Sequence, residues 1–371
     1  MGRISLYQLF CITIFYQLGT TVVFGFAAGA GRDSWLVILL STFIGAIIVA
    51  LYTVIMRLNP GLTLVEWYPA QLGPWIGIPI AWLYPLLALY DVGRILADLQ
   101  FAVSTTLLPN TPPLVFLGLT MFVIVVGLLY GIEVLGRIGE LIFPILLTLF
   151  VIQLILLLGS GVINLDNLQP FLANGWEVIW GEIWPLGLTQ TFAQSLELAM
   201  IWALTKQTGR IIKPTLIATF LSGMLIMSLN ILAITVLGEG LFQQSMYPMY
   251  LLIQQISIGE FIENLHAISV LQFTTTAILK LYIHAFVAVY AIQQLLFLRN
   301  HHIIIIVVAI IGIYMGMTMA TSAQEHIYVG TDIFPYNLWI PLLFVFPSIL
   351  LIVSIIRKIW SKKKVKRSFR I

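Results

Sequence analysis

The sequence predicts an all-α integral membrane protein with ten transmembrane helices. Of its 371 residues, 60% are hydrophobic and only 9% are charged, whereas a soluble domain carries about 25% charged residues. Charge-free stretches of the roughly 20 residues that a membrane helix needs recur along the chain. In lipid, a helix satisfies its backbone hydrogen bonds within one segment. The composition therefore excludes a soluble enzyme, a disordered protein and a nucleic-acid-binding module.

The ten predicted helices follow these stretches in chain order. The first is longer than the roughly 7 to 15 residues of a signal-peptide apolar region, so we expect it to remain uncleaved. Two stretches contain one charge each, Glu197 in the sixth and Lys280 in the eighth. The stretches are residues 4–31, 34–56, 67–90, 99–132, 141–165, 183–204, 214–238, 264–298, 300–324 and 333–356.

The distribution of Lys and Arg predicts the orientation. Most of the 18 basic residues fall on one side of the predicted spans, including eight in the tail after Ile356, and most acidic loop residues fall on the other. Positive loops stay inside, so we expect both termini to be cytoplasmic, as an even number of spans requires. The basic tail, residues 358–371, would also attract anionic membrane lipid, by about 1 kcal/mol for each basic residue.

Two longer segments lie on the outer side, residues 161–184 and 239–265. In the first, Trp176, Trp180 and Trp184 recur at helical spacing, which favours a helix anchored in the membrane interface. The second segment is expected either to anchor in the interface or to form a short helical cap over the outer mouth.

The third helix carries three charges that share one face, Asp91, Arg94 and Asp98. At these spacings, Arg94 can bridge both carboxylates. A charge inside a membrane is a functional candidate by default. For this group, however, a neutralised cluster that holds helices together is favoured over a direct substrate or proton role.

The sixth helix carries Glu197 after an unusually polar run. Two interpretations stand equally: the polar side chains join helices, or the helix is broken and its freed backbone lines a cavity. The candidate ligand-binding residues of this run are Thr189, Gln190, Thr191, Phe192, Gln194 and Glu197.

The eighth helix carries Lys280 with no acidic neighbour in the sequence. A lone buried ammonium is costly, which favours a functional role for it. The alternative is a structural ion pair with Glu197 or with the charges of the third helix.

The first helix is interrupted in its middle by Gln17, Gly19, Thr20, Thr21 and Gly25. Its break and the break of the sixth helix fall at corresponding positions of a five-plus-five repeat, about residues 4–160 and 183–357. An odd number of spans per half gives the halves opposite orientation. Matched interruptions of this kind predict a binding site at the bilayer midplane. A helix N-terminus there favours an anion, such as the carboxylate of a free amino acid.

Several short motifs occur along the chain: Gly19-Thr20, Gly31-Arg32-Asp33-Ser34-Trp35, Pro60-Gly61-Leu62-Thr63, Leu72-Gly73-Pro74-Trp75, and Asn167-Leu168-Gln169-Pro170-Phe171 with Gly175. Together with the positions of Glu197 and Lys280, these motifs resemble one known family, the B subunits of spore germinant receptors within the amino acid–polyamine–organocation transporter superfamily. The resemblance runs over nearly the whole chain.

The resemblance implies a transporter-like fold in the spore inner membrane and a small nutrient, typically an amino acid, as the ligand. It also implies two partners, a membrane A subunit and a lipoprotein C subunit. The ligand would lie between residues 19–25 and 189–197, facing helices three and eight, and the Lys280 ammonium would replace a cation that bridges helices one and eight. The polar run departs from the family pattern because it has no glycine after Gly187, which leaves the extent of the break in helix six open.

Two functions remain, a nutrient sensor that signals to partner subunits and an amino acid permease. The permease would be proton-coupled through Glu197 or through the pair Asp91 and Asp98. The resemblance favours the sensor. The sequence contains no motif of an enzyme and indicates no cofactor. With a single cysteine and two adjacent histidines that do not share a helix face, it predicts no metal site.

Overall fold

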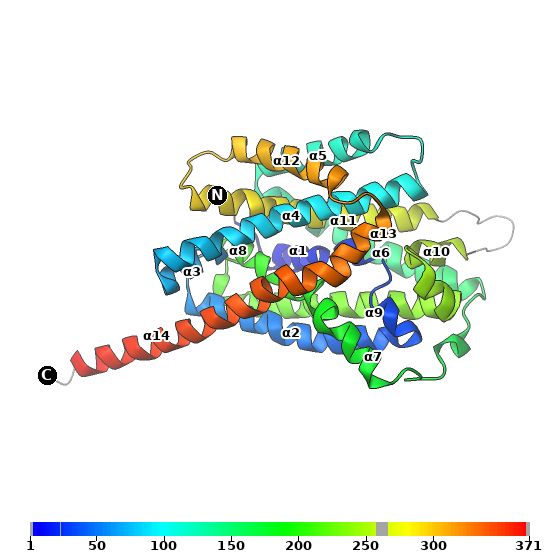
Figure 1. Ribbon diagram of the computed structural model, residues 1–371, viewed down its shortest axis with the longest axis horizontal. Helices are drawn as coiled ribbons and strands as arrows, with labels where there is room; N and C mark the ends of the chain where they lie inside the picture. Colours follow the sequence, from blue (N-terminus) through cyan, green and yellow to red (C-terminus); the bar gives the residue numbers. More distant parts are fainter. Residues whose placement is uncertain (1–2, 23, 257–265, 369–371) are drawn as a thin grey trace.

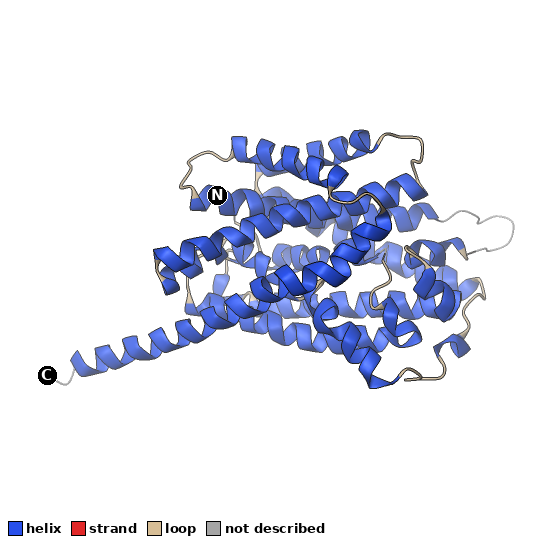
Figure 2. Cartoon of the chain, viewed as in Figure 1, coloured by secondary structure: helices blue, strands red, loops and turns tan. Residues whose placement is uncertain are grey.

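The protein is a bundle of helices whose axes run mostly along one direction (Figures 1 and 2). The computed structural model describes residues 3–22, 24–256 and 266–368, without the side chains of residues 266–267 and 361–368. Within this part of the chain every regular element is a helix, and one isolated bridge pairs Ile4 with Thr205. The predicted all-α fold class is confirmed.

The helices of the first half begin and end as follows: α1 (Leu6–Leu18), η1 (Gly19–Val22), η2 (Ala28–Asp33), α2 (Ser34–Leu58), α3 (Leu64–Leu72), α4 (Pro74–Thr106), α5 (Pro113–Tyr130), α6 (Ile132–Gly159) and η3 (Leu165–Leu168). Those of the second half are α7 (Gly175–Glu182), η4 (Ile183–Gly187), η5 (Ala193–Leu198), α8 (Ala199–Trp202), η6 (Thr208–Arg210), α9 (Ile212–Gln244), α10 (Pro248–Gln254), α11 (His266–Leu295), α12 (His302–Thr318), α13 (Ala323–Tyr328), η7 (Val329–Ile333), η8 (Pro335–Val345) and α14 (Phe346–Ser368).

Seven of the described helices are long and apolar enough to cross a membrane, and α12 with the bent segment after it gives an eighth. The first helix, Leu6–Val22, is apolar but shorter, and the sixth is divided among η4, η5 and α8. These two interrupted helices complete the predicted set of ten. The boundaries of the two repeats stay a prediction.

The third, fourth and fifth predicted spans had wrong limits, because glycine and proline end helices here and isolated charges do not. The third helix starts at Pro74, after Gly73 turns the chain with a φ of +80°, and continues to Thr106. All three charges of the third helix therefore lie within α4. The fourth and fifth helices meet at Gly131, where a φ of +84° separates α5 from α6.

The first helix loses its regular winding at Gly19, whose φ is +40°. A short 3-10 turn follows, and the chain becomes helical again at Ala28. The sixth helix is interrupted more extensively. A π-helical turn contains Trp184 in an extended conformation, and a 3-10 segment follows before α8. Both predicted breaks are confirmed, and the π-helical turn of helix six contains both Pro185 and Gly187.

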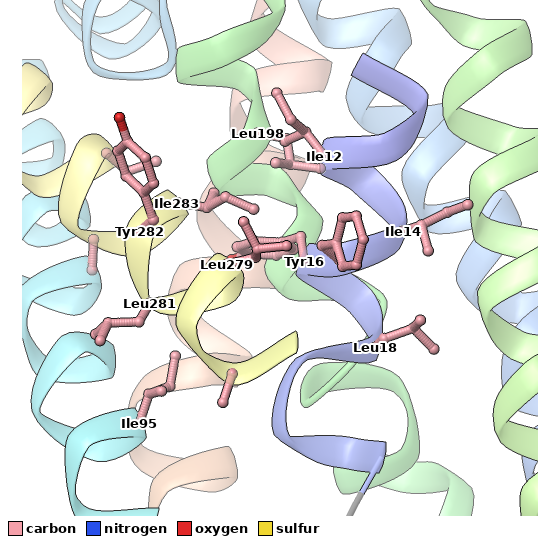
Figure 3. Packing of buried hydrophobic residues seen from close by; sticks show 14 of the residues in the cluster. Ile12, Ile14, Tyr16, Leu18, Ile95, Leu198, Leu279, Leu281, Tyr282 and Ile283 are labelled. Carbon is pink, nitrogen blue, oxygen red and sulfur yellow. The ribbon is translucent and has the colours of Figure 1, made fainter. Parts of the chain in front are cut away.

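The centre of the bundle is formed by α1 and α11. Every side chain of α1 from Cys11 to Leu18 is buried, and α11 packs against α1, α4 and the first break. Figure 3 shows Tyr16 of α1 and Leu279 of α11 in the space between these two helices. By contrast, α5, α6 and α12 expose many large apolar side chains at the periphery, as lipid-facing helices do.

The segments at the α7 and α10 end of the bundle are short helices. Trp176, Trp180 and Trp184 are about half exposed around α7, as an interfacial helix requires. Helix α10 packs on α9 and α11, and the rest of the predicted cap, residues 257–265, lies outside the described residues. The predicted ninth span also ends early, because α12 stops at Thr318 and the following segment turns by 115°.

Candidate functional site

A cavity of about 730 Å³ lies between the two interrupted helices. The break of helix one contributes Thr20, Thr21 and Gly25 to its wall, and the break of helix six contributes Pro185 and Gln190. The volume falls within the roughly 300 to 1,000 Å³ of ordinary small-molecule sites. The structure thus brings the two predicted breaks together around one polar space.

Charged side chains of both signs border this cavity. Helix α4 contributes Arg94 and Asp98, α7 contributes Glu182, and the bent segment after α12 contributes His326 and Asp332. Burial raises the pKa of Glu182, and the negative charge of Asp332 acts in the same direction. The cavity can therefore offer a cation and several anions to one small ligand.

The charges on α4 are not paired in the way the sequence predicted. Asp98 Oδ1 lies 2.8 Å from His326 Nε2. Arg94 donates instead to the Gly330 carbonyl at 3.4 Å, and its guanidinium lies 5.4 Å from the centre of the Trp339 ring. The predicted bridge from Arg94 to both carboxylates was wrong, because the C-terminal segments supply partners that helical spacing cannot reveal.

Lys280 is buried between the two breaks, with its side-chain stem against Gly19 of the first break. Its Nζ atom donates to Gln194 Oε1 at 3.2 Å, and Gln194 Nε2 lies 3.5 Å from Asp91 Oδ2. The ammonium is also 5.6 Å from the centre of the Tyr16 ring. Lys280 makes no ion pair with a described carboxylate, so the expected alternative of a direct pair with Glu197 or the third helix was wrong.

Glu197 belongs to a second buried group. Its Oε2 lies 2.8 Å from His284 Nδ1, and the same nitrogen lies 3.9 Å from Asp91 Oδ2. Glu197 and His284 are fully buried, and Asp91 is 3% exposed. Asp91, Glu197 and His284 therefore form one cluster that joins α4, the break of helix six and α11.

The other predicted residues have mainly structural neighbours. Thr189 donates to the Pro185 carbonyl at 3.0 Å, and Thr191 is buried. Phe192 packs where a side chain on Gly45 would have to lie, and the Gly19 carbonyl accepts from Thr276 Oγ1 at 2.7 Å. Of the predicted site residues, those bordering the cavity are Thr20, Thr21, Gly25, Gln190, Arg94 and Asp98.

Neither of the buried histidines His284 and His326 was among the residues predicted from the sequence. His284 follows Lys280 by four positions, so the two share a helix face, and a histidine within a membrane helix is a functional candidate. That signal was present in the sequence. His326 reaches Asp98 only because the chain bends after α12, and no local pattern indicates this.

The interrupted helices around a polar cavity define this chain as a multi-pass membrane protein with a transporter fold. A solved structure of Mhp1, a nucleobase-cation-symport-1 family transporter in a closed conformation with bromovinylhydantoin bound, has the same architecture. It aligns with a TM-score of 0.65 and 15% sequence identity, over 94% of this chain and 78% of Mhp1. The chain belongs to the spore germination protein family, whose model matches residues 3–326.

Curated relatives agree with this assignment. Spore germination protein KB of Bacillus subtilis (strain 168) is 28% identical over 367 residues, which cover 99% of this chain and 97% of the relative. Spore germination protein B2 of the same strain is 31% identical over 158 residues, 41% of each chain. The predicted resemblance is confirmed, and family and fold identify a non-enzymatic membrane protein.

Proposed function

We propose that this protein binds a small nutrient in the cavity between its interrupted helices and thereby triggers spore germination. The observation that carries the proposal is the cavity itself, which is of small-molecule size and is lined by both breaks. A ligand that contacts both breaks would stabilise one arrangement of the two helices over another. Only such a difference in affinity between states lets a ligand shift a conformational equilibrium.

The lining favours an amino acid as the nutrient. Arg94 supplies a cation for a carboxylate, while Glu182 and Asp332 supply anions for an ammonium group. Thr20, Thr21 and Gln190 add neutral hydrogen-bonding groups. A zwitterion satisfies both signs of charge, whereas a purely apolar ligand would leave these groups unpaired.

The proposed receptor role also implies partner subunits and a particular membrane. The protein would act with a membrane A subunit and a lipoprotein C subunit in the spore inner membrane. Both termini would be cytoplasmic, which puts the α7 and α10 end of the bundle on the outer side and lets the cavity meet nutrients from outside. The basic tail would lie against the anionic inner leaflet.

A binding experiment tests the ligand site directly. Purified protein is screened with single amino acids by thermal shift, since a ligand that binds the folded state raises the unfolding temperature. We expect at least one amino acid to raise it, and Thr331→Trp, which fills the cavity, to abolish the shift. The matched control is Thr148→Trp on the exposed face of α6, which should leave the shift intact. A shift that survives Thr331→Trp would exclude this cavity.

The second candidate is an amino acid permease, which the transporter fold shared with Mhp1 favours. Uptake of labelled amino acids into proteoliposomes that contain this chain alone separates the two functions. A sensor should bind its ligand without concentrating it, and concentrative uptake would establish the permease.

A further inference from the structure

The cluster of Asp91, His284 and Glu197 lies at the meeting point of three elements. One carboxylate oxygen of Asp91, one of Glu197 and one ring nitrogen of His284 all lie within 4.8 Å of one another. Asp91 comes from α4, Glu197 from the interrupted part of helix six, and His284 from α11. Two buried polar atoms of the cluster, Glu197 Oε1 and His284 Nε2, have no hydrogen-bond partner. The cluster is therefore built from charged groups that remain incompletely satisfied.

The surrounding charges do not balance. Two carboxylates, Asp91 and Glu197, belong to the cluster, and the described cation linked to them is Lys280, through Gln194, so one negative charge is in excess while His284 is neutral. Helix α1 adds the Tyr16 ring, 5.0 Å from the His284 ring, but no charge. The other two charges of α4, Arg94 and Asp98, contact Gly330 and His326 at the cavity instead. An unneutralised charge in a membrane interior is costly, so one further positive charge is required.

Two carboxylate–histidine pairs, Glu197 with His284 and Asp98 with His326, are candidates to hold the additional proton. The pair at Glu197 is favoured. Asp98 and His326 border the cavity, where water can stabilise a charge. Glu197 and His284 are fully buried and lie outside the cavity wall. Burial without solvent disfavours a charged carboxyl group, and the second carboxylate at Asp91 adds repulsion.

The hydrogen bonds indicate which atom carries the charge. A doubly protonated His284 would bury a charged Nε2–H group with no acceptor. A neutral ring that donates through Nδ1 to Glu197 Oε2 avoids this. The amide of Gln194 donates to Asp91 and accepts from Lys280, which links an ionised Asp91 to the ammonium. Glu197 is the remaining carboxyl group of the cluster. When it is protonated, its unpaired atom Oε1 belongs to a neutral carboxyl group and no longer to a charged carboxylate.

We propose that Glu197, His284 and Asp91 form a buried proton-binding site in which the Glu197 carboxyl group carries the proton. The bound proton holds the interrupted part of helix six against α4 and α11. Its loss leaves two carboxylates on either side of His284 Nδ1, which repel each other and push the break of helix six away from α4. The site needs no nutrient, so this inference stands independently of the proposed function.

Infrared spectroscopy of the purified full-length protein in lipid nanodiscs tests the site, because a protonated carboxyl group has its own carbonyl band. We expect this band at neutral pH, and a shift of the band when the protein contains carbon-13-labelled glutamate but not labelled aspartate. The band should vanish in Glu197→Gln. It should persist in Asp98→Asn and in Glu182→Gln, whose carboxyl groups border the cavity. The labelling arm uses the unmodified protein, so it remains decisive even where a variant does not fold.

Three results would overturn the proposal. The band could be absent from mildly acidic to mildly alkaline pH, it could shift with labelled aspartate only, or it could persist in a folded Glu197→Gln protein. Metal binding at the same atoms is tested separately with Zn²⁺, Ca²⁺ and Na⁺ alone. An ion that raises the unfolding temperature of the unmodified protein but not of Glu197→Gln would replace the proton as the ligand of this site.

Discussion

The stem of Lys280 lies directly over Gly19, where helix one loses its regular winding. A side chain at position 19 would occupy the place of Lys280 Cδ, and the backbone there has a φ of +40°. Thr276, one turn before Lys280, donates to the Gly19 carbonyl at 2.7 Å. Helix α11 thus fixes the end of α1 through a close approach that only glycine permits.

Gly19→Ala is expected to destabilise the protein by at least about 2 kcal/mol, because it combines backbone strain with overlap in a packed interior. Thermal unfolding in detergent measures the effect. The matched control is Gly118→Ala on α5, where an added Cβ meets no atom within 4 Å. The control should be neutral or slightly stabilising, since alanine favours a helix. Equal stability of both variants would contradict the packing described here.

If the protein is the nutrient receptor proposed above, Lys280→Met is expected to leave a folded, inserted protein that no longer supports the nutrient response. Methionine keeps most of the apolar stem, but removes the donor to Gln194 and the charge that offsets Asp91. The response is measured as germination of spores that carry the variant, and insertion as the amount of protein in the membrane. Lys213→Met at the exposed start of α9 is the control. A normal response from Lys280→Met would remove Lys280 from the functional machinery.

Arg32 and Glu239 form an ion pair that ties the segment after helix one to the end of α9. Both side chains are about one-fifth exposed, and Arg32 also donates to the Gln169 carbonyl. Reversing either charge should destabilise the protein by about 1 to 2 kcal/mol, and the double reversal should recover much of that loss.

Thermal unfolding of the two single variants and the double variant gives the coupling energy of this pair. The exposed pair of Glu133 and Arg137, separated by 3.7 Å within α6, is the comparison and should couple by no more than about 0.5 kcal/mol. A coupling energy near zero for Arg32 and Glu239 would show that the pair does not join these segments.

The stability of the protein should fall as the pH rises through the neutral range. If Glu197 holds a proton when the protein is folded and releases it on unfolding, the folded state binds one proton more. The free energy of unfolding then decreases by about 1.4 kcal/mol per pH unit. Denaturation across pH measures the slope, and the slope difference between the unmodified protein and Glu197→Gln isolates this group. Parallel slopes would argue against a proton on Glu197.

The sequence predicted the architecture well because a membrane restricts the choice. Long apolar stretches can only be helices, and the polar interruptions near Gly19 and before Glu197 mark real breaks. The limits of α4, α5 and α6 were less accurate. A charge such as Asp91 ends an apolar stretch without ending a helix, whereas Gly73 and Gly131 do end helices.

The site was harder to predict because its contacts join distant parts of the chain. His326 reaches Asp98 across 228 positions, and Arg94 reaches Gly330 across 236. Helical spacing reveals only neighbours on one helix, so it suggested an Arg94 bridge that is not formed. The pair of Lys280 and His284 was accessible from spacing alone, since both residues lie on one face of α11.

The wall of the cavity includes Tyr336, which lies near the start of η8. From there the chain continues without interruption through η8 and α14 to Ser368, and α14 projects away from the bundle (Figure 1). One continuous helical segment thus has one end at the cavity and its other end at Ser368. Because the displacement of a tilted segment grows with distance from its pivot, a tilt at Tyr336 would move the far end of α14 the most.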